Sequence, residues 1–392
     1  MNSSESLKPE LSRPQQIATV VGVIGLALCA AEYFMRPQQF FRSYLLGIVF
    51  WIGIGLASLG LLMLHHLVAG RWGYVIRRPL EAGSRTILWM AILFIPVLLG
   101  LRYLYIWARP AAVAADPILQ YKHPYLNVPF FVVRTVIYFA LWIVIAYLLN
   151  KWSLQQDESG DPELIKKMRN LSGPGMVIYG FTVSWAGIDW VMSLEPHWFS
   201  TIYGLIFVIT EAVGAMSLIT IVAMLLSKSE VLSGALVPDR FHDFGNLLLV
   251  FTMLWAYLSF CQFLIIWAGN LQNEIPWYVV RANGGWAWVA LILIVFHFAV
   301  PFLLLLQRVV TYQKQLLAWV AALLFVVSIL DIFWLLTPAF NTTGPQFHWA
   351  DWVAIVGIGG VWVAIFLSQL KSRPLLPVND PRFQGVLQHE RG

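Results

Sequence analysis

Ten separate stretches of this 392-residue chain are apolar enough and long enough to cross a lipid bilayer. A helix needs roughly 20 apolar residues to span the hydrocarbon core. Because backbone polar groups must be satisfied inside lipid, each stretch is expected to be a helix, and the chain is predicted to be an all-α polytopic membrane protein. The ten transmembrane helices are predicted at residues 17–35, 43–67, 84–108, 129–150, 174–192, 200–226, 243–268, 285–307, 316–336 and 349–370.

Composition excludes several other classes of protein. Hydrophobic residues make up 59% of the chain and charged residues only 11%, whereas a soluble domain carries about 25% charged residues. The apolar runs are continuous rather than alternating, which excludes a transmembrane barrel. The net charge of +5 comes from basic residues spread over short loops, so it indicates membrane topology and no nucleic-acid partner.

The lysines and arginines predict how the chain is oriented. Eighteen of them lie on the side of the two termini and five on the other side. The positive-inside rule then predicts cytoplasmic segments at 1–16 and 371–392 around a transmembrane domain at 17–370. The longest loop, 151–173, is expected to be a solvated segment on the same side. Mixed charges before the first span argue against a cleaved signal peptide.

The two cysteines limit the cofactors that the chain can hold. Cys29 and Cys261 lie far apart inside apolar stretches. The sequence has no motif for covalent haem, an iron–sulfur cluster or structural zinc. We therefore expect no haem, cluster or metal in this chain.

Ionisable residues inside spans are costly and are functional candidates by default. Glu211 lies near the middle of the sixth span, on a helix with a small and polar face. It is either a protonated carboxyl hydrogen-bonded across a helix interface or a proton relay. A relay requires that burial make the neutral carboxyl accessible.

His297 lies midway along the eighth span, and Pro301 follows four residues later. Because proline has no N–H, the carbonyl of His297 loses its helical donor. A titratable ring beside such a kink suits proton transfer, although a packed structural histidine or a haem ligand are alternatives. We interpret Glu211 and His297 as the midpoint of a proton route.

Further titratable residues fall near the ends of the spans. The candidates for this route are His65, Glu81 and Asp243 on the inside, and Asp189, Glu195, His197 and Asp331 on the outside. We expect Asp189, Glu195 and His197 to meet a partner subunit or form a proton exit, with a metal site as the alternative. A buried Asp189 would need a cation or a proton.

Three more polar features have structural interpretations. Asp351 opens the tenth span and is expected to stabilise that helix terminus. Arg77 and Arg78 are expected to meet anionic lipid headgroups. In the seventh span, a partly polar stripe recurs at helical spacing and is expected to line either a helix contact or a cavity; it comprises Gly245, Leu248, Thr252, Trp255, Ser259 and Gln262.

Particular strings carry a resemblance to a known family. They are His65-His66-Leu67-Val68-Ala69-Gly70-Arg71-Trp72-Gly73 with Arg77-Arg78-Pro79-Leu80-Glu81-Ala82, then Asp189-Trp190-Val191-Met192-Ser193-Leu194-Glu195-Pro196-His197-Trp198-Phe199-Ser200-Thr201, and His242-Asp243 leading into Gln262-Phe263-Leu264-Ile265-Ile266-Trp267. The strings resemble the large membrane subunits of alternative complex III, a bacterial quinol:cytochrome c oxidoreductase. The segments 125–131 and 373–377 resemble the smaller NrfD-like membrane subunit, the ActF type.

The resemblance implies a fold, partners and a role. It implies two four-helix bundles, spans 2–5 and 6–9, flanked by spans 1 and 10, in the bacterial inner membrane. The partners it implies are a larger NrfD-like membrane subunit, haem c subunits and an iron–sulfur subunit, with surrounding lipids. The smaller subunit is expected to support assembly and proton translocation, with quinone binding by this chain as an alternative. Gln272, Asn273 and Glu274 depart from the acidic stretch of the family.

Two other classes of function compete with this interpretation. A stand-alone secondary transporter would show inverted repeats with broken helices at matching positions. Pro96 and Pro301 lie inside spans but do not form a mirrored pair. In a passive scaffold, the buried ionisable residues would only pair with one another.

Overall fold

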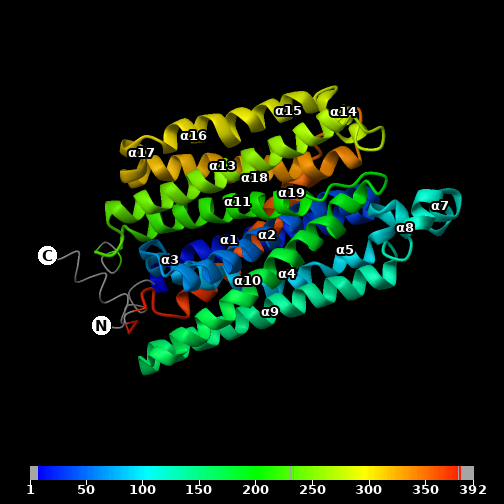
Figure 1. Cartoon of the computed structure of the whole chain (residues 1–392). Coiled ribbons are helices and arrows are strands. Elements are labelled where there is room, and N and C mark those ends of the chain that lie inside the picture. Colours follow the sequence, from blue (N-terminus) through cyan, green and yellow to red (C-terminus); the bar gives the residue numbers. More distant parts are fainter. Residues whose placement is uncertain (1–7, 230–231, 233, 378, 381–392) are drawn as a thin grey trace.

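The computed structural model describes residues 8–229, 232, 234–377 and 379–380. Within these residues every regular element is helical, and ten helical segments are long and apolar enough to span a membrane. The predicted fold class, an all-α polytopic membrane protein with ten spans, is confirmed at this level. Figure 1 shows the long helices lying side by side, with α2 and α11 between α9 at one edge and α14–α17 at the other.

The long helices are α1 (Lys8–Met35), α2 (Pro37–Val68), α9 (Val128–Ser159), α10 (Pro162–Trp190), α11 (Tyr203–Leu226), α13 (Pro238–Gly269), α18 (Lys314–Leu336) and α19 (Trp349–Lys371). Two further spans are built from shorter pieces: α3 (Arg71–Ser84), α4 (Ile87–Leu93) and α5 (Ile95–Leu99), and α15 (Trp286–Leu293), η3 (Ile294–Ala299) and α16 (Val300–Leu305). Connecting helices include α6 (Leu101–Leu104), α7 (Pro110–Ala115), α8 (Pro117–Lys122), α14 (Ile275–Ala282) and α17 (Arg308–Tyr312).

The third span begins and ends earlier than the sequence indicates. Residues 84–108 were the expected span, but the helical segment runs from Arg71 to Leu99. Its first part, α3, is amphipathic and carries charged residues, so hydropathy alone does not identify it as part of a span. Arg77 and Arg78 of α3 are nevertheless buried, because they pair with Glu81 of the same helix and with Asp157 and Asp380 elsewhere in the fold.

The expected loop at 151–173 is almost entirely helical. Helix α9 continues to Ser159 and α10 starts at Pro162, so only Gly160 and Asp161 separate them. Gly160 has a φ of 68° and ends α9, and the Asp161 side chain accepts a hydrogen bond from the Glu163 amide at the start of α10. Because the facing ends of these two helices are polar, a search for apolar runs makes both helices shorter than they are.

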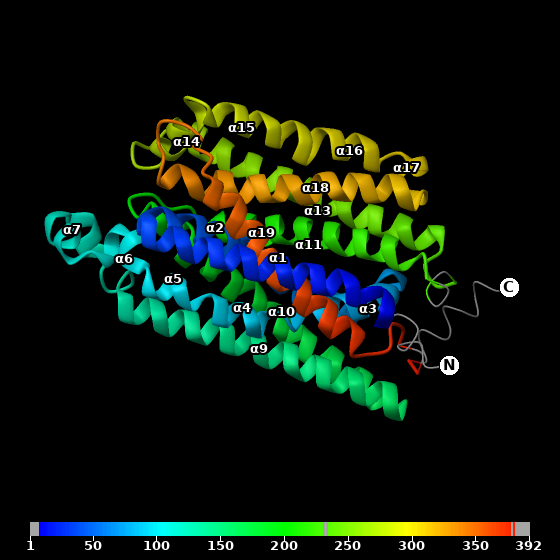
Figure 2. The same cartoon turned by 180° about the vertical axis from the view of Figure 1, so that it is seen from behind.

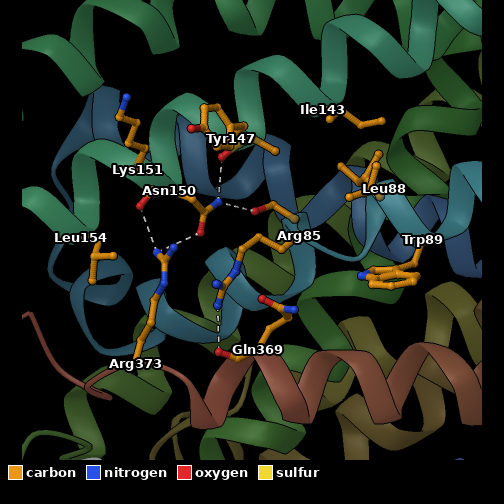
Figure 3. Close-up of a pocket in the computed structure, with 13 residues that line it drawn as sticks. Arg85, Leu88, Trp89, Ile143, Tyr147, Asn150, Lys151, Leu154, Gln369 and Arg373 are labelled. Atoms are coloured by element: carbon orange, nitrogen blue, oxygen red, sulfur yellow. Dashed lines mark hydrogen bonds between the residues drawn. The ribbon is translucent and has the colours of Figure 1, made fainter.

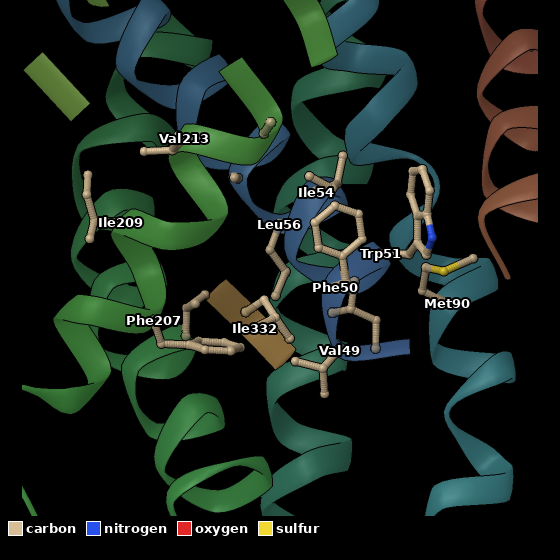
Figure 4. Close-up of a cluster of buried hydrophobic side chains, with 14 of the residues drawn as sticks. Val49, Phe50, Trp51, Ile54, Leu56, Met90, Phe207, Ile209, Val213 and Ile332 are labelled. Atoms are coloured by element: carbon tan, nitrogen blue, oxygen red, sulfur yellow. The ribbon is translucent and has the colours of Figure 1, made fainter. Parts of the chain in front are cut away.

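Helix α2 is the centre of the packing. The most apolar part of this span is wholly buried, whereas every other span leaves part of its surface exposed. Its neighbours are α1, α3, α4, α10, α11, α18 and α19. Figure 4 shows Phe50 of α2 between Phe207 of α11 and Met90 of α4. A helix that is apolar all round belongs in such a central position.

The first and last helices pack against each other. Helix α1 lies along α19 on one face of the molecule (Figure 2). The contact depends on glycine: a Cβ atom on Gly25 would lie 2.3 Å from the Cα of Gly357. Small residues at such crossings let two membrane helices approach closely. Lys371 Nζ donates to Ser12 Oγ at 3.2 Å, so the start of α1 and the end of α19 lie at the same end of the bundle.

Candidate functional site

The centre of the second half of the chain contains a buried histidine and a buried carboxylate. His297 Nδ1 lies 4.0 Å from Asp331 Oδ2, and both side chains are almost completely buried. The same carboxylate oxygen accepts hydrogen bonds from Thr210 Oγ1 at 2.7 Å and from Trp255 Nε1 at 2.8 Å. The Trp255 and His297 ring centroids are 4.2 Å apart. We call Thr210, Trp255, His297 and Asp331 the central cluster; its residues come from four different helical spans.

The chain geometry around His297 is irregular. Residues Ile294–Ala299 form a π-helical turn, and Pro301 lies just beyond it in α16. A proline opens the helical hydrogen-bond ladder, and π-turns recur at functional sites in helices. The sequence predicted a kink here, and the structure contains a π-turn that places His297 against α13 and α18.

Protonation of the central cluster follows from its partners. Among the described residues, no lysine or arginine lies within ion-pair distance of Asp331. A buried carboxylate without a cation requires either a protonated neighbour or a proton of its own. We expect the His297–Asp331 pair to hold at least one proton, and a transfer between the two groups would change no net charge.

Glu211 is the other central ionisable residue. It follows Thr210 on α11 but faces α2, where a Cβ atom on Gly53 would lie 2.6 Å from Glu211 Oε1. Both carboxyl oxygens are buried and have no hydrogen-bond partner among the described residues. An ionised carboxylate in such a place would cost far more than a neutral one. We expect the neutral acid.

The structure places the two expected midpoint residues in separate environments. Thr210 links α11 to Asp331 and hence to His297, whereas Glu211, one residue later, lies against α2. Asp331, which was grouped with the outer carboxylates, instead lies beside His297. The central polar region thus contains three ionisable residues rather than two.

At the end of the bundle that is expected to face outward, Asp189 has the cation that its burial requires. Arg134 Nε and Nη2 donate to the two oxygens of Asp189 at 2.8 and 2.9 Å, and the Tyr138 hydroxyl donates to Asp189 Oδ2 at 2.9 Å. The Arg134 guanidinium also lies over the Tyr125 ring, 3.9 Å from its centroid. Such a bidentate pair fixes α9 against α10.

Glu195 and His197 have other partners. Glu195 accepts a hydrogen bond from Arg281 Nη2 of α14 at 2.8 Å. His197 Nε2 lies 2.5 Å from Asp116 Oδ2, outside the spans. The hydrogen bond to the His197 ring lowers the pKa of Asp116. Because Asp189, Glu195 and His197 pair with three different residues, the structure does not bring them together as a set of metal ligands.

At the end of the bundle that is expected to face inward, Glu81 lies at the centre of an ion-pair network, which we call the inner network. Its two oxygens are 3.1 Å from Arg77 Nε and 2.6 Å from Arg78 Nη1, and Ser153 Oγ donates to Oε1 at 2.5 Å. Arg373 Nη1, just after α19, lies 3.5 Å from Glu81 Oε2. Burial lowers the pKa of the Arg373 guanidinium, and Glu81 opposes that shift.

Two further carboxylates complete this inner network. Arg78 also pairs with Asp157 of α9, and Arg77 Nη1 lies 3.2 Å from Asp380 Oδ2. Three arginines thus face three carboxylates. The expectation that Arg77 and Arg78 meet lipid headgroups is wrong, because both are almost completely buried in these ion pairs.

The other inner candidates, His65 and Asp243, have different surroundings from Glu81. His65 is buried, with its ring centroid 4.7 Å from that of Tyr74. Asp243 is partly exposed, and its Oδ2 lies 3.6 Å from Arg240 Nη1 on the same helix. In the same helix, the stripe from Gly245 to Gln262 is largely the buried face, as its spacing predicted.

Of two carboxylates near the start of α19, the sequence analysis predicted the role of one and missed the other. Asp351 accepts a hydrogen bond from the His348 amide at 3.0 Å in a capping box, which confirms its helix-terminal role. Glu32 was missed. It is buried in α1, with Oε1 3.9 Å from His348 Nε2. A carboxylate near the end of a long apolar run was its only signal.

No family model matches this chain, and no curated protein matches it either. Its function must therefore be inferred from its own residues, of which the buried ionisable ones are the most informative. Among the buried carboxylates, Glu81, Asp189 and Asp380 each have an arginine partner. Glu211 and Asp331, in the middle of the bundle, have no arginine or lysine partner among the described residues.

The Arg134–Asp189 pair yields a stability prediction. Arg134→Gln leaves a buried carboxylate uncompensated, so we expect the free energy of unfolding to fall by about 3 kcal/mol. The double variant Arg134→Met with Asp189→Leu should recover part of that loss. Lys166→Gln is the control, because Lys166 and Glu163 form an exposed pair worth less than about 1 kcal/mol. Equal effects of Arg134→Gln and Lys166→Gln in detergent unfolding titrations would contradict the assignment.

Proposed function

We propose that this integral membrane protein is a subunit of a respiratory quinol:electron-acceptor oxidoreductase of the alternative complex III type. In this proposal it takes part in proton translocation and supports the assembly of partner subunits. The observation that carries the proposal is the central polar region, where Glu211 and the His297–Asp331 pair are buried without a lysine or arginine partner. A scaffold that only paired its charges would not require such residues.

The helix contacts support the expected bundle arrangement. Helices α2, α3, α4, α9 and α10 contact one another, and α11 contacts α13 and α18, with α16 against both α13 and α18. Helices α1 and α19 pack together against α2. These contacts agree with spans 2–5 and 6–9 as two groups flanked by spans 1 and 10. We propose that two proton half-channels, one from each side of the membrane, lead to the second group, which contains the central cluster.

The redox centres are proposed to lie in partners. The two cysteines are dispersed, at positions 29 and 261, so haem c and iron–sulfur clusters are assigned to the other subunits. The larger NrfD-like subunit is proposed to oxidise quinol beside this chain in the bacterial inner membrane. Both termini are proposed to be cytoplasmic, in line with the positive-inside rule.

Fewer residues are proposed to change protonation than the sequence indicated. Asp189, Glu195 and Glu81 are held in ion pairs with arginines. We therefore propose that they are fixed charges along the route. Glu211, His297 and Asp331 are the residues proposed to change protonation.

The complex itself can be tested by native purification. The protein isolated from its own membrane in mild detergent should bring down its partners, and the preparation should show haem c absorbance. A colourless monomer would support a stand-alone secondary transporter instead. Dissociation of the complex should leave this chain without a Soret band.

The proton role can be tested with Glu211→Gln, which keeps the volume of the side chain and removes its titration. We expect the assembled complex in liposomes to retain quinol oxidation and to lose proton translocation. Glu163→Gln is the matched control, because Glu163 is an exposed carboxylate of α10. Normal assembly of the Glu211 variant with unchanged proton stoichiometry would make Glu211 a structural contact and would remove it from the route.

A further inference from the structure

A cavity of about 370 Å³ opens between α3, α4 and α9 at the end of the bundle that holds Arg373. Its walls include aliphatic and aromatic side chains, among them Leu88, Trp89 and Tyr147, which are exposed on the outer surface of the helices. Its polar end contains Arg85, Lys151 and Arg373. Figure 3 shows Arg85 and Arg373 side by side below α9, with Trp89 on the apolar side.

Among the described residues, the charges at this cavity do not balance. Arg373 belongs to the inner network, where three arginines meet three carboxylates. Arg85 and Lys151 are additional. Among the described residues, neither has a carboxylate within ion-pair distance, and Arg85 Nε is buried without a hydrogen-bond partner. Two positive charges at the rim of a membrane-facing cavity therefore lack a counter-charge.

Arg85 is held in place although it has no counter-ion. Its Nη2 donates to the Gln369 carbonyl of α19 at 2.8 Å. Arg373 donates to the Asn150 carbonyl at 3.0 Å on the other side of the cavity. The two guanidinium groups are thus fixed by backbone carbonyls, and their remaining N–H groups can donate to an anion.

We propose that this cavity binds the headgroup of an anionic phospholipid. The phosphate would accept hydrogen bonds from Arg85 and interact with Lys151, while the acyl chains would lie along Leu88 and Trp89. Basic pockets between membrane helices bind anionic headgroups, and tryptophan and tyrosine settle at the headgroup level. A neutral quinone headgroup would leave both charges uncompensated, and so would a zwitterionic lipid. The proposal is independent of the proposed redox complex.

The test uses the full-length protein, delipidated in neutral detergent and analysed by native mass spectrometry. Phosphatidylglycerol, phosphatidylcholine with the same acyl chains, and inorganic phosphate are the three probes. We expect one phosphatidylglycerol to bind at least about tenfold more tightly than phosphatidylcholine, and inorganic phosphate not to displace it. Equal binding of the two lipids, or displacement by inorganic phosphate or by a quinone, would overturn the proposal.

Charge variants locate the binding to this cavity. Lys151 is exposed and has no hydrogen bond to lose, so Lys151→Gln should leave the fold intact and weaken phosphatidylglycerol binding by about fivefold. Adding Arg85→Gln should weaken it by about fivefold again. Lys167→Gln, an exposed lysine of α10, is the control and should have no effect. Unchanged affinity in the Lys151 variant would overturn the assignment even if the Arg85 variant fails to fold.

Discussion

The burial of α2 on every side is the constraint on which the rest of the structure depends. The most apolar part of this helix is wholly buried, so its neighbours pack directly against it. Gly53 leaves the space that the Glu211 carboxyl of α11 occupies. An acidic group is therefore held at the helix interface where water and lipid are both excluded. Burying an ionised carboxylate there without a partner would cost several kcal/mol or more, which favours the neutral form.

The ionisable residues of the spans fall into two groups, those with an arginine partner and those without one. Near the ends of the bundle, arginines neutralise Asp189, Glu195 and Glu81, and these pairs tie together helices that are distant in sequence. In the middle, Glu211 and the His297–Asp331 pair have no lysine or arginine partner among the described residues, and we propose that protons neutralise them. Ion pairs of the first kind fix a structure, whereas groups of the second kind can change their charge when a proton arrives. The proposed proton role concerns only the second kind.

The sequence predicted the number of spans, their helical nature and the central candidates, because each of these depends on local composition. It did not predict the partners. Arg134 and Asp189 are 55 positions apart, and Arg77 and Asp380 are 303 positions apart, so no local pattern relates them. Helix lengths were underestimated because the ends of α9 and α10 are polar and largely exposed, whereas α3 was missed for another reason. Charged residues that are buried by ion pairs look like loop residues to a hydropathy count.

The central claim is that Glu211 is a neutral acid in the folded protein. Infrared spectroscopy of the purified chain in H₂O and D₂O resolves the carbonyl stretch of protonated carboxyl groups at neutral pH. The account predicts a component of this band that shifts on deuterium exchange, is lost in Glu211→Gln and is kept in Glu163→Gln. A spectrum in which the band is the same in the wild-type protein and in Glu211→Gln would mean that Glu211 is ionised, and would contradict the account.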